Sequence, residues 1–283
     1  MASLISIQLN SGNNIVQNLD AAQLHIQHAC EQADKERLVV LPECFSLFGV
    51  SGKDMLAAAE LMGTGLVQRR LSEMATVNNC FIVAGSMPIK PSQDANKYFA
   101  ASLVFSPNGE CIARYNKIHL FDVTVNDSTS NYCESAYTMA GQHLSLFNTG
   151  FADVGQSVCY DLRFAAMFSA YTSFTESKQA PMVIVVPSAF TQATGKAHWH
   201  TLLRARSIEN QCFIVASNQT GTHVDGRETF GHSCIYSPWG SCLSVVEKDV
   251  GFAIAKFDLE TLKKVRSNMP IHDHKKERYQ IES

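Results

Sequence analysis

Long apolar runs are missing from this chain of 283 residues, and so is an excess of either charge. No segment approaches the roughly 18 consecutive apolar residues of a membrane span, and residues 1–10 lack the basic region and apolar run of an export signal. The 26 acidic and 23 basic residues nearly cancel, so no broad positive field attracts phosphate backbones or anionic lipid. We therefore expect a cytoplasmic protein that binds neither nucleic acid nor membrane.

Metal-binding and disulfide patterns are missing as well. The nine cysteines are an odd number in a chain too long to need disulfides for stability, and the closest pair, Cys234 and Cys242, is too widely spaced for a Cys-x-x-Cys site. His198 and His200 are two residues apart, which points them to different faces of a helix, and the chain has no His-Glu-x-x-His motif. We expect reduced cysteines, most of them packed in the core, and no metal or other cofactor.

Two other functional motifs fail on their spacing. The Gly52-Lys53 pair has no glycine at the distance that a phosphate-binding loop requires, and Asp54 replaces the hydroxyl residue that would bind magnesium. Ser157 lacks the second glycine of a serine nucleophile elbow, which disfavours a Ser-His-Asp hydrolase. A phosphate-binding loop and a serine nucleophile are therefore not expected.

Short aliphatic or β-branched segments alternate with longer helical ones, which is typical of α/β proteins. Residues 16–33 have apolar side chains at helical spacing, and residues 55–77 form a second helix-like stretch. Turn residues at 108–109 and 238–240 predict two hairpins, so the sheet structure should have antiparallel parts. No stretch rich in Pro, Gly and Ser or in one charge divides the chain, so we predict one domain over residues 1–283.

Cys159 differs from the other cysteines in its position. It closes a strand predicted over residues 153–158 and precedes a helix predicted from about 162 to 175, which Asp161 is placed to cap. Its sulfur should lie near unpaired backbone N–H groups and the positive end of a helix dipole, and both favour the thiolate. The alternative is packing, because many cysteines end strands in the core.

Glu43 and Lys117 lie at the ends of two further strands. Glu43 follows the buried strand in VVLPECF, where proline prevents regular pairing, and a carboxylate at the end of a sheet suits a general base. Its alternative is a glutamate in a surface loop. Lys117 ends the strand CIARYNK, where its ammonium would stabilise a negative oxygen beside the backbone N–H of Tyr160, or would simply reach solvent.

Three segments, taken in order, resemble the signature segments of the nitrilase superfamily of carbon-nitrogen hydrolases. They are LPECF with Glu43, YNKIHLFD with Lys117 and SVCYDLRF with Cys159. The resemblance continues through CESAYTMAG, which contains Glu134, and through PSAFTQATGKAHWH and GHSCIYSPWG, so it covers nearly the whole chain. These segments are most similar to the deaminated glutathione amidases and the neighbouring omega-amidases. One departure is Ala-Ala at 165–166, where the family often has Pro-Glu, which weakens the expectation of how the following helix starts.

The resemblance implies a fold, an assembly and a set of roles. The fold is a four-layer α-β-β-α sandwich, an α/β structure with two central mixed sheets flanked by helices, and its subunits pair into an extended homodimer. Glu43 would be the general base, Cys159 the nucleophile that forms a thioester, and Lys117 the stabiliser of the oxyanion. Glu134 would be a second carboxylate that positions the lysine or the substrate, and the backbone N–H of Tyr160 would complete the oxyanion site.

The resemblance favours hydrolysis of deaminated glutathione to 2-oxoglutarate and cysteinyl-glycine. This substrate carries an α-keto carboxylate and a distal glycine carboxylate, so the site needs donors away from the triad. Arg163 suits bidentate binding of a carboxylate, although arginine is also the usual choice for a structural salt bridge. Phe190 and Thr194 would line the pocket on the resemblance alone, and packing is their alternative role.

Three other functions stay open. An omega-amidase that releases ammonia from a keto-acid amide would use the same catalytic residues and differ only in the pocket for the leaving group. A simple nitrilase fits less well, because the segments around Glu134 and Phe190 resemble those of the amidases. A non-catalytic binding or regulatory protein of the same fold is disfavoured by the retention of the Glu-Lys-Cys triad.

Overall fold

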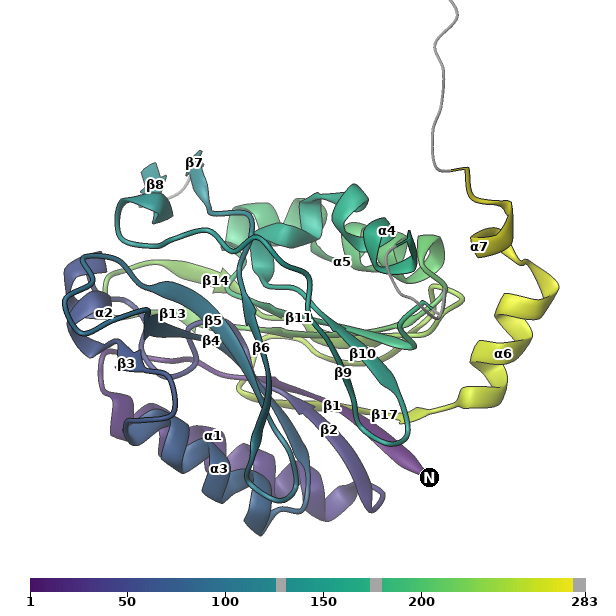
Figure 1. The fold of residues 1–283 in the computed structure, drawn as a ribbon, viewed down its shortest axis with the longest axis horizontal. Coiled ribbons are helices and arrows are strands. Elements are labelled where there is room, and N and C mark those ends of the chain that lie inside the picture. Colours follow the sequence, from purple (N-terminus) through teal and green to yellow (C-terminus); the bar gives the residue numbers. More distant parts are fainter. Residues whose placement is uncertain (126–130, 174–179, 277–283) are drawn as a thin grey trace, which may run out of the picture.

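The computed structural model describes residues 1–125, 131–173 and 180–276. Two large sheets lie face to face at its centre, with helices on their outer faces (Figure 1). The first sheet has the strand order β17-β1-β2-β4-β5-β6, with β3 paired to β4, and the second has the order β16-β15-β12-β11-β10-β9. The strands of the first sheet are β1 (Ala2–Gln8), β2 (Glu36–Val40), β3 (Glu60–Leu61), β4 (Phe81–Lys90), β5 (Phe99–Phe105), β6 (Cys111–Asn116) and β17 (Gly251–Phe257). Those of the second are β9 (Leu146–Asn148), β10 (Asp153–Gln156), β11 (Val183–Ser188), β12 (Phe213–Asn218), β15 (Ser233–Tyr236) and β16 (Cys242–Val246).

Both sheets have parallel strands at the centre and antiparallel strands at the edges. In the first sheet β1, β2 and β4 are parallel, and in the second β10, β11 and β12 are parallel. The remaining neighbours in the two strand orders pair antiparallel. A parallel bridge between Leu9 and Gln219 shows that the central strands of the two sheets run in the same direction. Their carboxyl ends therefore meet at one end of the molecule, which is where open α/β sheets bind ligands.

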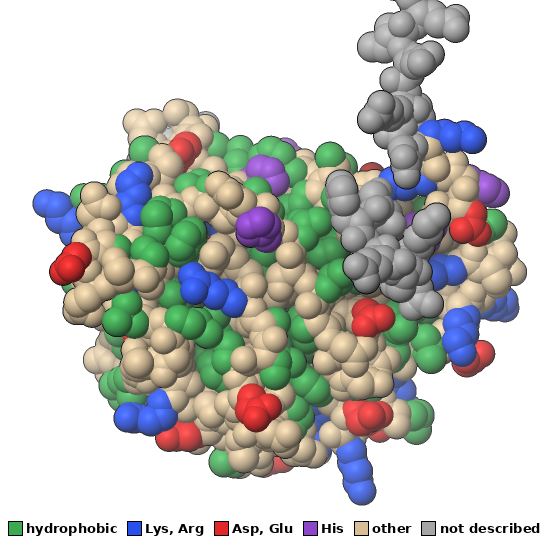
Figure 2. Space-filling model, viewed as in Figure 1, with side chains coloured by type: hydrophobic (Ala, Val, Ile, Leu, Met, Phe, Trp, Pro, Cys, Tyr) green, Lys and Arg blue, Asp and Glu red, His purple; other side chains and the backbone are tan. Residues whose placement is uncertain are grey.

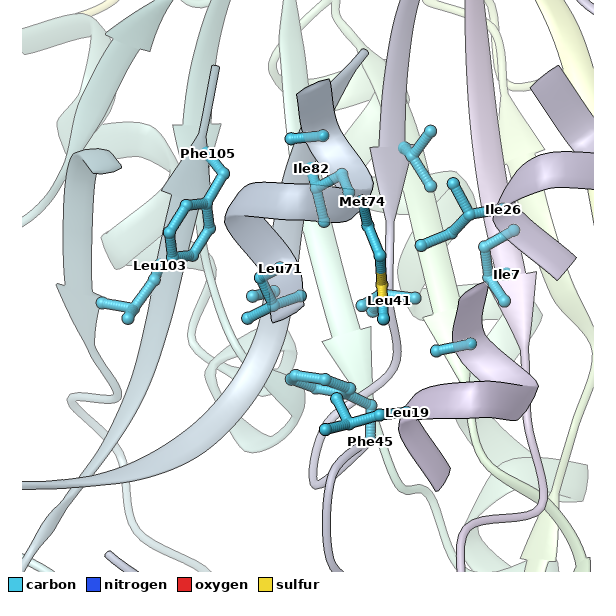
Figure 3. Close-up of a cluster of buried hydrophobic side chains, with 14 of the residues drawn as sticks. Ile7, Leu19, Ile26, Leu41, Phe45, Leu71, Met74, Ile82, Leu103 and Phe105 are labelled. Carbon is cyan, nitrogen blue, oxygen red and sulfur yellow. The ribbon is translucent and has the colours of Figure 1, made fainter. Parts of the chain in front are cut away.

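Three apolar layers hold the sandwich together. The first lies between the first sheet and the helices α1 (Ile15–Gln32) and α3 (Leu66–Val77), and Figure 3 shows Leu19 and Ile26 of α1 and Leu71 and Met74 of α3 turned toward the strands. The second fills the space between the two sheets, and the third lies between the second sheet and the helices α4 (Ala165–Ser173) and α5 (Gln192–Glu209). This arrangement confirms the predicted four-layer α-β-β-α sandwich.

The remaining elements are short and lie at the ends of the sandwich. Two small sheets each contain two strands, β7 with β8 and β13 with β14. Their bounds, with those of the other helices, are β7 (Asp122–Thr124), β8 (Asn131–Cys133), β13 (Thr220–Thr222), β14 (Glu228–Phe230), α2 (Gly52–Ala58), α6 (Leu259–Asn268), α7 (Ile271–His274) and the 3-10 turns η1 (Glu134–Ala136) and η2 (Cys159–Arg163).

The sequence predicted the first helix and both hairpins correctly but was wrong about residues 55–77. The structure breaks that stretch into the end of α2, the strand β3 and α3. α2 ends at Ala58, and Gly63 and Gly65, with positive φ angles of 79° and 108°, lie in the turn between β3 and α3. The carboxylate of Glu60 then accepts hydrogen bonds from the backbone N–H groups of Val67 and Gln68, at 2.7 and 3.2 Å, and so caps the start of α3.

Lysine and arginine side chains are interspersed with acidic ones on the face shown in Figure 2. No broad patch of one charge is visible on that face, in agreement with the nearly balanced composition. Within the described residues, none of the helices combines the length and the apolar character needed to cross a membrane.

Candidate active site

A pocket of about 420 Å³ opens at the carboxyl ends of the parallel strands. Its wall contains Glu43 from the loop after β2, Cys159 from the turn after β10 and Phe190 from the loop after β11. Lys117, at the end of β6, and Glu134, the first residue of η1, complete its polar part. Five segments that are far apart in the sequence thus contribute to one cavity.

The backbone around Glu43 is held by both sheets. Cys44 has a positive φ of 56°, and its N–H donates to the carbonyl oxygen of Ser86, at 3.1 Å, beyond the point where β2 ends. The carbonyl oxygen of Glu43 accepts a hydrogen bond from Nε2 of Gln219, in the second sheet's half of the molecule, at 3.0 Å. Gly85 is required beside this loop, because a Cβ at that position would lie 1.8 Å from the carbonyl oxygen of Pro42. The side chain of Glu43 is consequently fixed in the pocket and only 6% of the residue is exposed.

Lys117 is almost fully buried between two carboxylates. Its Nζ lies 2.8 Å from Oε1 of Glu43 and 2.8 Å from Oε2 of Glu134. Its backbone is fixed as well, because its N–H donates to Ala100 and its carbonyl oxygen accepts from Gly141. Burial disfavours the ammonium, but the carboxylates of Glu134 and Glu43 outweigh it and raise the pKa of Lys117 well above its ordinary value. The lysine is therefore a buried cation and does not reach solvent, the alternative that the sequence had left open.

Glu134 is held by more than the lysine. Its Oε2 also accepts a hydrogen bond from the backbone N–H of Phe121, at 2.7 Å. Burial raises the pKa of the Glu134 carboxyl despite the opposing effect of Lys117, and the nearby carboxylate of Glu43 adds to the rise. Two carboxylates and one ammonium thus share a site from which most water is excluded.

Cys159 lies at a sharp elbow between β10 and η2. Its φ is 49°, in the left-handed region that non-glycine residues rarely adopt, and only 7% of the residue is exposed. Its thiol lies close to the carboxylate of Glu43, to the ammonium of Lys117 and to the backbone N–H of Ala189, all of which act on its pKa. The sulfur thus belongs to the same buried cluster as the two carboxylates and the ammonium.

The prediction that the surroundings of Cys159 favour the thiolate was wrong. Burial and then the negative charge of Glu43 raise the pKa of the Cys159 thiol well above its ordinary value, and these effects outweigh Lys117 and the Ala189 N–H. The residue is followed by a single 3-10 turn, and α4 begins only at Ala165, so no long helix directs its dipole at the sulfur. The raised pKa favours the protonated thiol, so a base would have to remove its proton before the sulfur could act as a nucleophile.

The prediction that Asp161 caps a helix starting near residue 162 was also wrong. Asp161 is fully buried, and its Oδ2 accepts hydrogen bonds from the Tyr115 hydroxyl, at 2.7 Å, and from the Val158 N–H, at 2.9 Å. Its Oδ1 accepts from the backbone N–H of His119, at 3.0 Å, and lies 2.8 Å from Nδ1 of the same residue. Because Val158 precedes the cysteine and His119 follows the lysine by two residues, Asp161 ties together the segments that carry Cys159 and Lys117.

Tyr160 and Arg163 lie on the 3-10 turn that begins with Cys159, and both line the pocket. The Arg163 guanidinium lies 5.8 Å from the centre of the Tyr160 ring and 5.2 Å from that of Phe190, and its Nη1 donates to Nδ1 of His198 at 3.2 Å. Within the described residues, Arg163 forms no salt bridge. The ion pair that the sequence left as an alternative is therefore not seen in this part of the chain.

Phe190 and Thr194 line the pocket and also pack against their neighbours. The centres of the Phe190 and Trp199 rings lie 4.8 Å apart, and the backbone N–H of Phe190 donates to Oδ1 of Asn218. Thr194 lies in the first turn of α5, where its hydroxyl is 2.9 Å from that of Thr191, the N-cap residue. Phe190 and Thr194 therefore both line the pocket and pack against the protein, the two roles that the sequence left open.

Sequence reasoning missed several residues of the pocket wall. Cys44 directly follows Glu43 and Phe48 lies five residues after it, whereas Asp225 and Arg227 come from the turn between β13 and β14. Cys44 could have been predicted to line the pocket because it follows the LPE segment. The residues around Arg227 resemble any charged turn, so its place in the pocket could not have been predicted. In residues 1–125, 131–173 and 180–276 no three side chains of the metal-ligating types form a cluster.

Chemically, the arrangement brings together a thiol, a carboxylate and a buried cation. A carboxylate that contacts both the thiol and the ammonium can move a proton from the sulfur while the cation balances new negative charge. Four side chains form this cluster, those of Glu43, Lys117, Glu134 and Cys159, and the lysine that the two carboxylates share lies at its centre.

Comparison with known proteins agrees with this geometry. Residues 5–267 match the family model described as carbon-nitrogen hydrolase. The chain is 38% identical to a deaminated glutathione amidase of Synechocystis sp. over 272 residues, which are 95% of this chain and 96% of that one. It is 32% identical to the omega-amidase NIT2 of Danio rerio over 268 residues, 95% of this chain and 92% of that one. The solved structure of the C. elegans NitFhit protein is 33% identical with a TM-score of 0.85, over 96% of this chain but 64% of that chain.

Proposed function

The chain belongs to the carbon-nitrogen hydrolase family, as its three signature segments predicted, and we propose that it is an amidase acting on deaminated glutathione through Glu43, Lys117 and Cys159. The products would be 2-oxoglutarate and cysteinyl-glycine. The observation that carries the proposal is the buried cluster in which Nζ of Lys117 lies 2.8 Å from the carboxylate of Glu43 and both groups lie close enough to the Cys159 thiol to act on its pKa. The 38% identity to a deaminated glutathione amidase supports the choice of substrate.

The first step is attack on the amide carbonyl carbon. Glu43 takes the proton of the Cys159 thiol as the sulfur forms a bond to that carbon, because the raised pKa of the thiol leaves little thiolate beforehand. The carbonyl oxygen becomes negative and is stabilised by the Lys117 ammonium and by the backbone N–H of Tyr160. Glu134 keeps the lysine charged and in place, since it remains a partner of Nζ when Glu43 has become neutral.

The second step releases the amine, and the third restores the enzyme. Protonated Glu43 passes its proton to the nitrogen as the carbon-nitrogen bond breaks, which leaves the acyl group on Cys159 as a thioester. A water molecule then loses a proton to Glu43 while its oxygen attacks the thioester carbon. The carbon-sulfur bond breaks, the sulfur takes back the proton, and the carboxylic acid leaves. One carboxylate thus serves as base, acid and base again.

The substrate needs a cation for its α-keto carboxylate, and Arg163 is placed to provide it. Its guanidinium lies in the pocket wall, four residues after the nucleophile, and forms no salt bridge within the described part of the chain. Its planar fork can hold a carboxylate with two parallel hydrogen bonds. Phe190 supports the guanidinium by stacking beneath it, and Thr194 borders the same region of the pocket.

An omega-amidase is the second candidate, supported by the 32% identity to omega-amidase NIT2. It would use the same triad on a keto-acid amide and release ammonia. A simple nitrilase or a non-catalytic binding protein lacks a specific supporting observation. Product analysis separates the two amidases, because free cysteinyl-glycine from deaminated glutathione supports the first, whereas ammonia from the keto-acid amide alone supports the second.

The test compares the purified wild type with Cys159→Ala on deaminated glutathione, with 2-oxoglutarate and cysteinyl-glycine both quantified. We expect a folded variant whose rate is lower by at least about 10⁴-fold, because nucleophile and base act as a unit. Cys111→Ala is the matched control, since Cys111 is an exposed cysteine on β6, outside the pocket. Full activity in Cys159→Ala would show that another sulfur is the nucleophile, and a wild type inactive on amides and nitriles alike would favour the binding role.

The extended homodimer and the cytoplasmic location implied by the sequence stay predictions. A dimer would have about twice the 31.2 kDa mass of one chain, which light scattering at micromolar concentration measures directly. A mass equal to one chain would contradict it.

A further inference from the structure

A second arginine, Arg227, lines the pocket from the turn between β13 and β14. Its guanidinium carbon lies 4.5 Å from the centre of the Phe48 ring, and its Nε donates to Oδ2 of Asp225 at 2.5 Å. Stacking restrains the tilt of the guanidinium and the ion pair restrains its rotation, so the two contacts together fix its plane. The side chain is partly buried and held against the pocket wall.

The turn that carries Arg227 is anchored to the body of the protein by His223. Nδ1 of the imidazole donates to the carbonyl oxygen of Ser11, at 2.9 Å, so Nε2 accepts from the hydroxyl of Thr229, at 2.7 Å. The same ring meets the edge of Phe48 with the centroids 4.4 Å apart. Burial lowers the pKa of His223, which keeps the imidazole neutral and this pattern of hydrogen bonds intact. Arg227 therefore has a rigid support.

The end of the Arg227 side chain is available to a ligand. A guanidinium has five N–H donors, and the ion pair with Asp225 uses the one on Nε. Within residues 1–125, 131–173 and 180–276, no hydrogen bond from Nη1 or Nη2 of Arg227 to another protein group is observed. These two nitrogens form the edge that binds a carboxylate with two parallel hydrogen bonds.

Neither of the other cations in the pocket duplicates this position. Lys117 already pairs with two carboxylates, and its third N–H is the one proposed to stabilise the carbonyl oxygen. Arg163 is supported by Phe190, in the loop after β11, whereas Arg227 is supported by Phe48, in the loop after β2. The two guanidinium groups share no described contact, so they border different stretches of the pocket wall.

Arg227 is also within electrostatic range of the Cys44 thiol, in the residue that follows the proposed base. Burial raises the pKa of the Cys44 thiol to about 12, and Arg227 is among the positive groups that oppose this rise. Arg227 therefore lines the same cavity as Cys44 and Glu43. With Arg163 holding the α-keto carboxylate, as proposed above, the carboxylate at the other end of the substrate is the one left for Arg227.

From these contacts we propose that Arg227 binds a carboxylate on the leaving-group side of the substrate, so that the site selects amides with a carboxylate at both ends. The inference rests on the proposed amidase function and specifies its substrate class. In deaminated glutathione the glycine carboxylate belongs to the departing cysteinyl-glycine, whose two residues span at most about 7 Å. A keto-acid amide that releases ammonia has no such group, so Arg227 would contribute nothing to its binding.

Two acidic side chains line the pocket near Arg227, but they do not remove its preference for a carboxylate. Asp225 is neutralised by its ion pair with Arg227, and Glu228 is exposed to water, where its charge is screened. The Arg227–Asp225 pair has no net charge, so a carboxylate at this end would be held by the Nη1 and Nη2 donors of the guanidinium. A neutral carboxamide in place of the carboxylate would lose the charged pair while keeping nearly the same shape.

The test measures binding in the Cys159→Ala background by calorimetry, with deaminated glutathione and its C-terminal carboxamide as ligands. We expect Arg227→Gln to weaken binding of the carboxylate about 10- to 100-fold, as for loss of a charge-assisted pair, and to change binding of the carboxamide less than about twofold. Arg227→Lys should recover part of the loss, since it keeps the charge without the fork. Arg69→Gln, at an exposed site on α3, is the matched control and should affect neither ligand. Thermal unfolding of each variant verifies that it is folded.

Equal losses for the two ligands in Arg227→Gln, or no loss for either, would overturn the inference, because both results mean that Arg227 does not bind the carboxylate. Failure of the proposed function has a different signature. In that case wild-type protein with Cys159 intact would release neither 2-oxoglutarate nor cysteinyl-glycine, whatever the binding measurements show. Hydrolysis by the wild type together with indifference to Arg227 would leave the amidase proposal standing and remove only this inference.

Discussion

Replacing Asp161 by asparagine should destabilise the protein and slow catalysis, although the residue does not touch the substrate pocket. Its two oxygens accept hydrogen bonds from the Tyr115 hydroxyl, the Val158 N–H and the His119 N–H, and one of them contacts the His119 ring. Asparagine has the same shape but only one accepting oxygen. If that oxygen stays with His119, the new amide group faces Tyr115 and Val158 and presents a donor to donors.

The expected cost follows from these contacts. The Val158 N–H loses its acceptor in a fully buried place, which costs about 1–3 kcal/mol, and the bond from Tyr115 loses its charged acceptor, which adds about 1 kcal/mol. The total is about 2–4 kcal/mol. Unfolding entropy of about 2.1 cal/mol/K per residue amounts to about 0.6 kcal/mol/K for this chain, so Tm should fall by about 3–7 °C. Since Val158 precedes Cys159, the proposed nucleophile, kcat should fall about 10- to 100-fold with little change in KM.

Calorimetry gives the Tm, and initial rates on deaminated glutathione give kcat and KM. Asp94→Asn, at an exposed position, is the matched control and should shift Tm by less than about 1 °C. An Asp161→Asn protein with unchanged Tm would refute the reasoning that the four contacts carry stability. A lowered Tm with unchanged kcat would show that Asp161 supports the fold without positioning the cysteine.

Two further predictions concern charges in the pocket. Lys117→Met should lower the unfolding free energy by about 3–5 kcal/mol, and by more at pH 8 than at pH 5, because the bare carboxylates of Glu43 and Glu134 repel each other until one takes up a proton. Because the pKa of Lys117 is raised, the stability that its ammonium contributes is fully present below its unfolded pKa of about 10.4 and is lost only as pH rises through the folded pKa. Urea titration of both proteins at pH 5 and pH 8 measures the loss of unfolding free energy. An equal loss at the two pH values would contradict the prediction. Because burial and Glu43 raise the pKa of Cys159, its alkylation by iodoacetamide should accelerate about tenfold per pH unit from pH 7 to 9. Mass spectrometry of the modified peptide follows this, and a rate independent of pH would indicate a resting thiolate.

The order of strands and helices could be predicted well from local patterns. The apolar spacing in residues 16–33 marks a helix in any α/β protein, and the turn residues at 108–109 and 238–240 can form only tight connections. The single helix predicted over residues 55–77 was wrong because the apolar spacing is helical throughout that stretch. The interruption between α2 and α3 depends on the positive φ angles at Gly63 and Gly65 and on the cap from Glu60. A helix boundary made by a side chain from outside the helix leaves little trace in the pattern.

Sequence alone determined the chemical identity of the candidate triad, its order along the chain and the family, because three short segments each carry a distinctive motif. Only the tertiary structure decided that Glu43 and Lys117, 74 positions apart, lie 2.8 Å from each other. It also decided that Cys159 rests as a thiol, that Asp161 joins two segments and that Arg227 faces the pocket. The physical reason is that burial and long-range electrostatics set protonation states and contacts, and both depend on which groups folding brings together from distant parts of the chain.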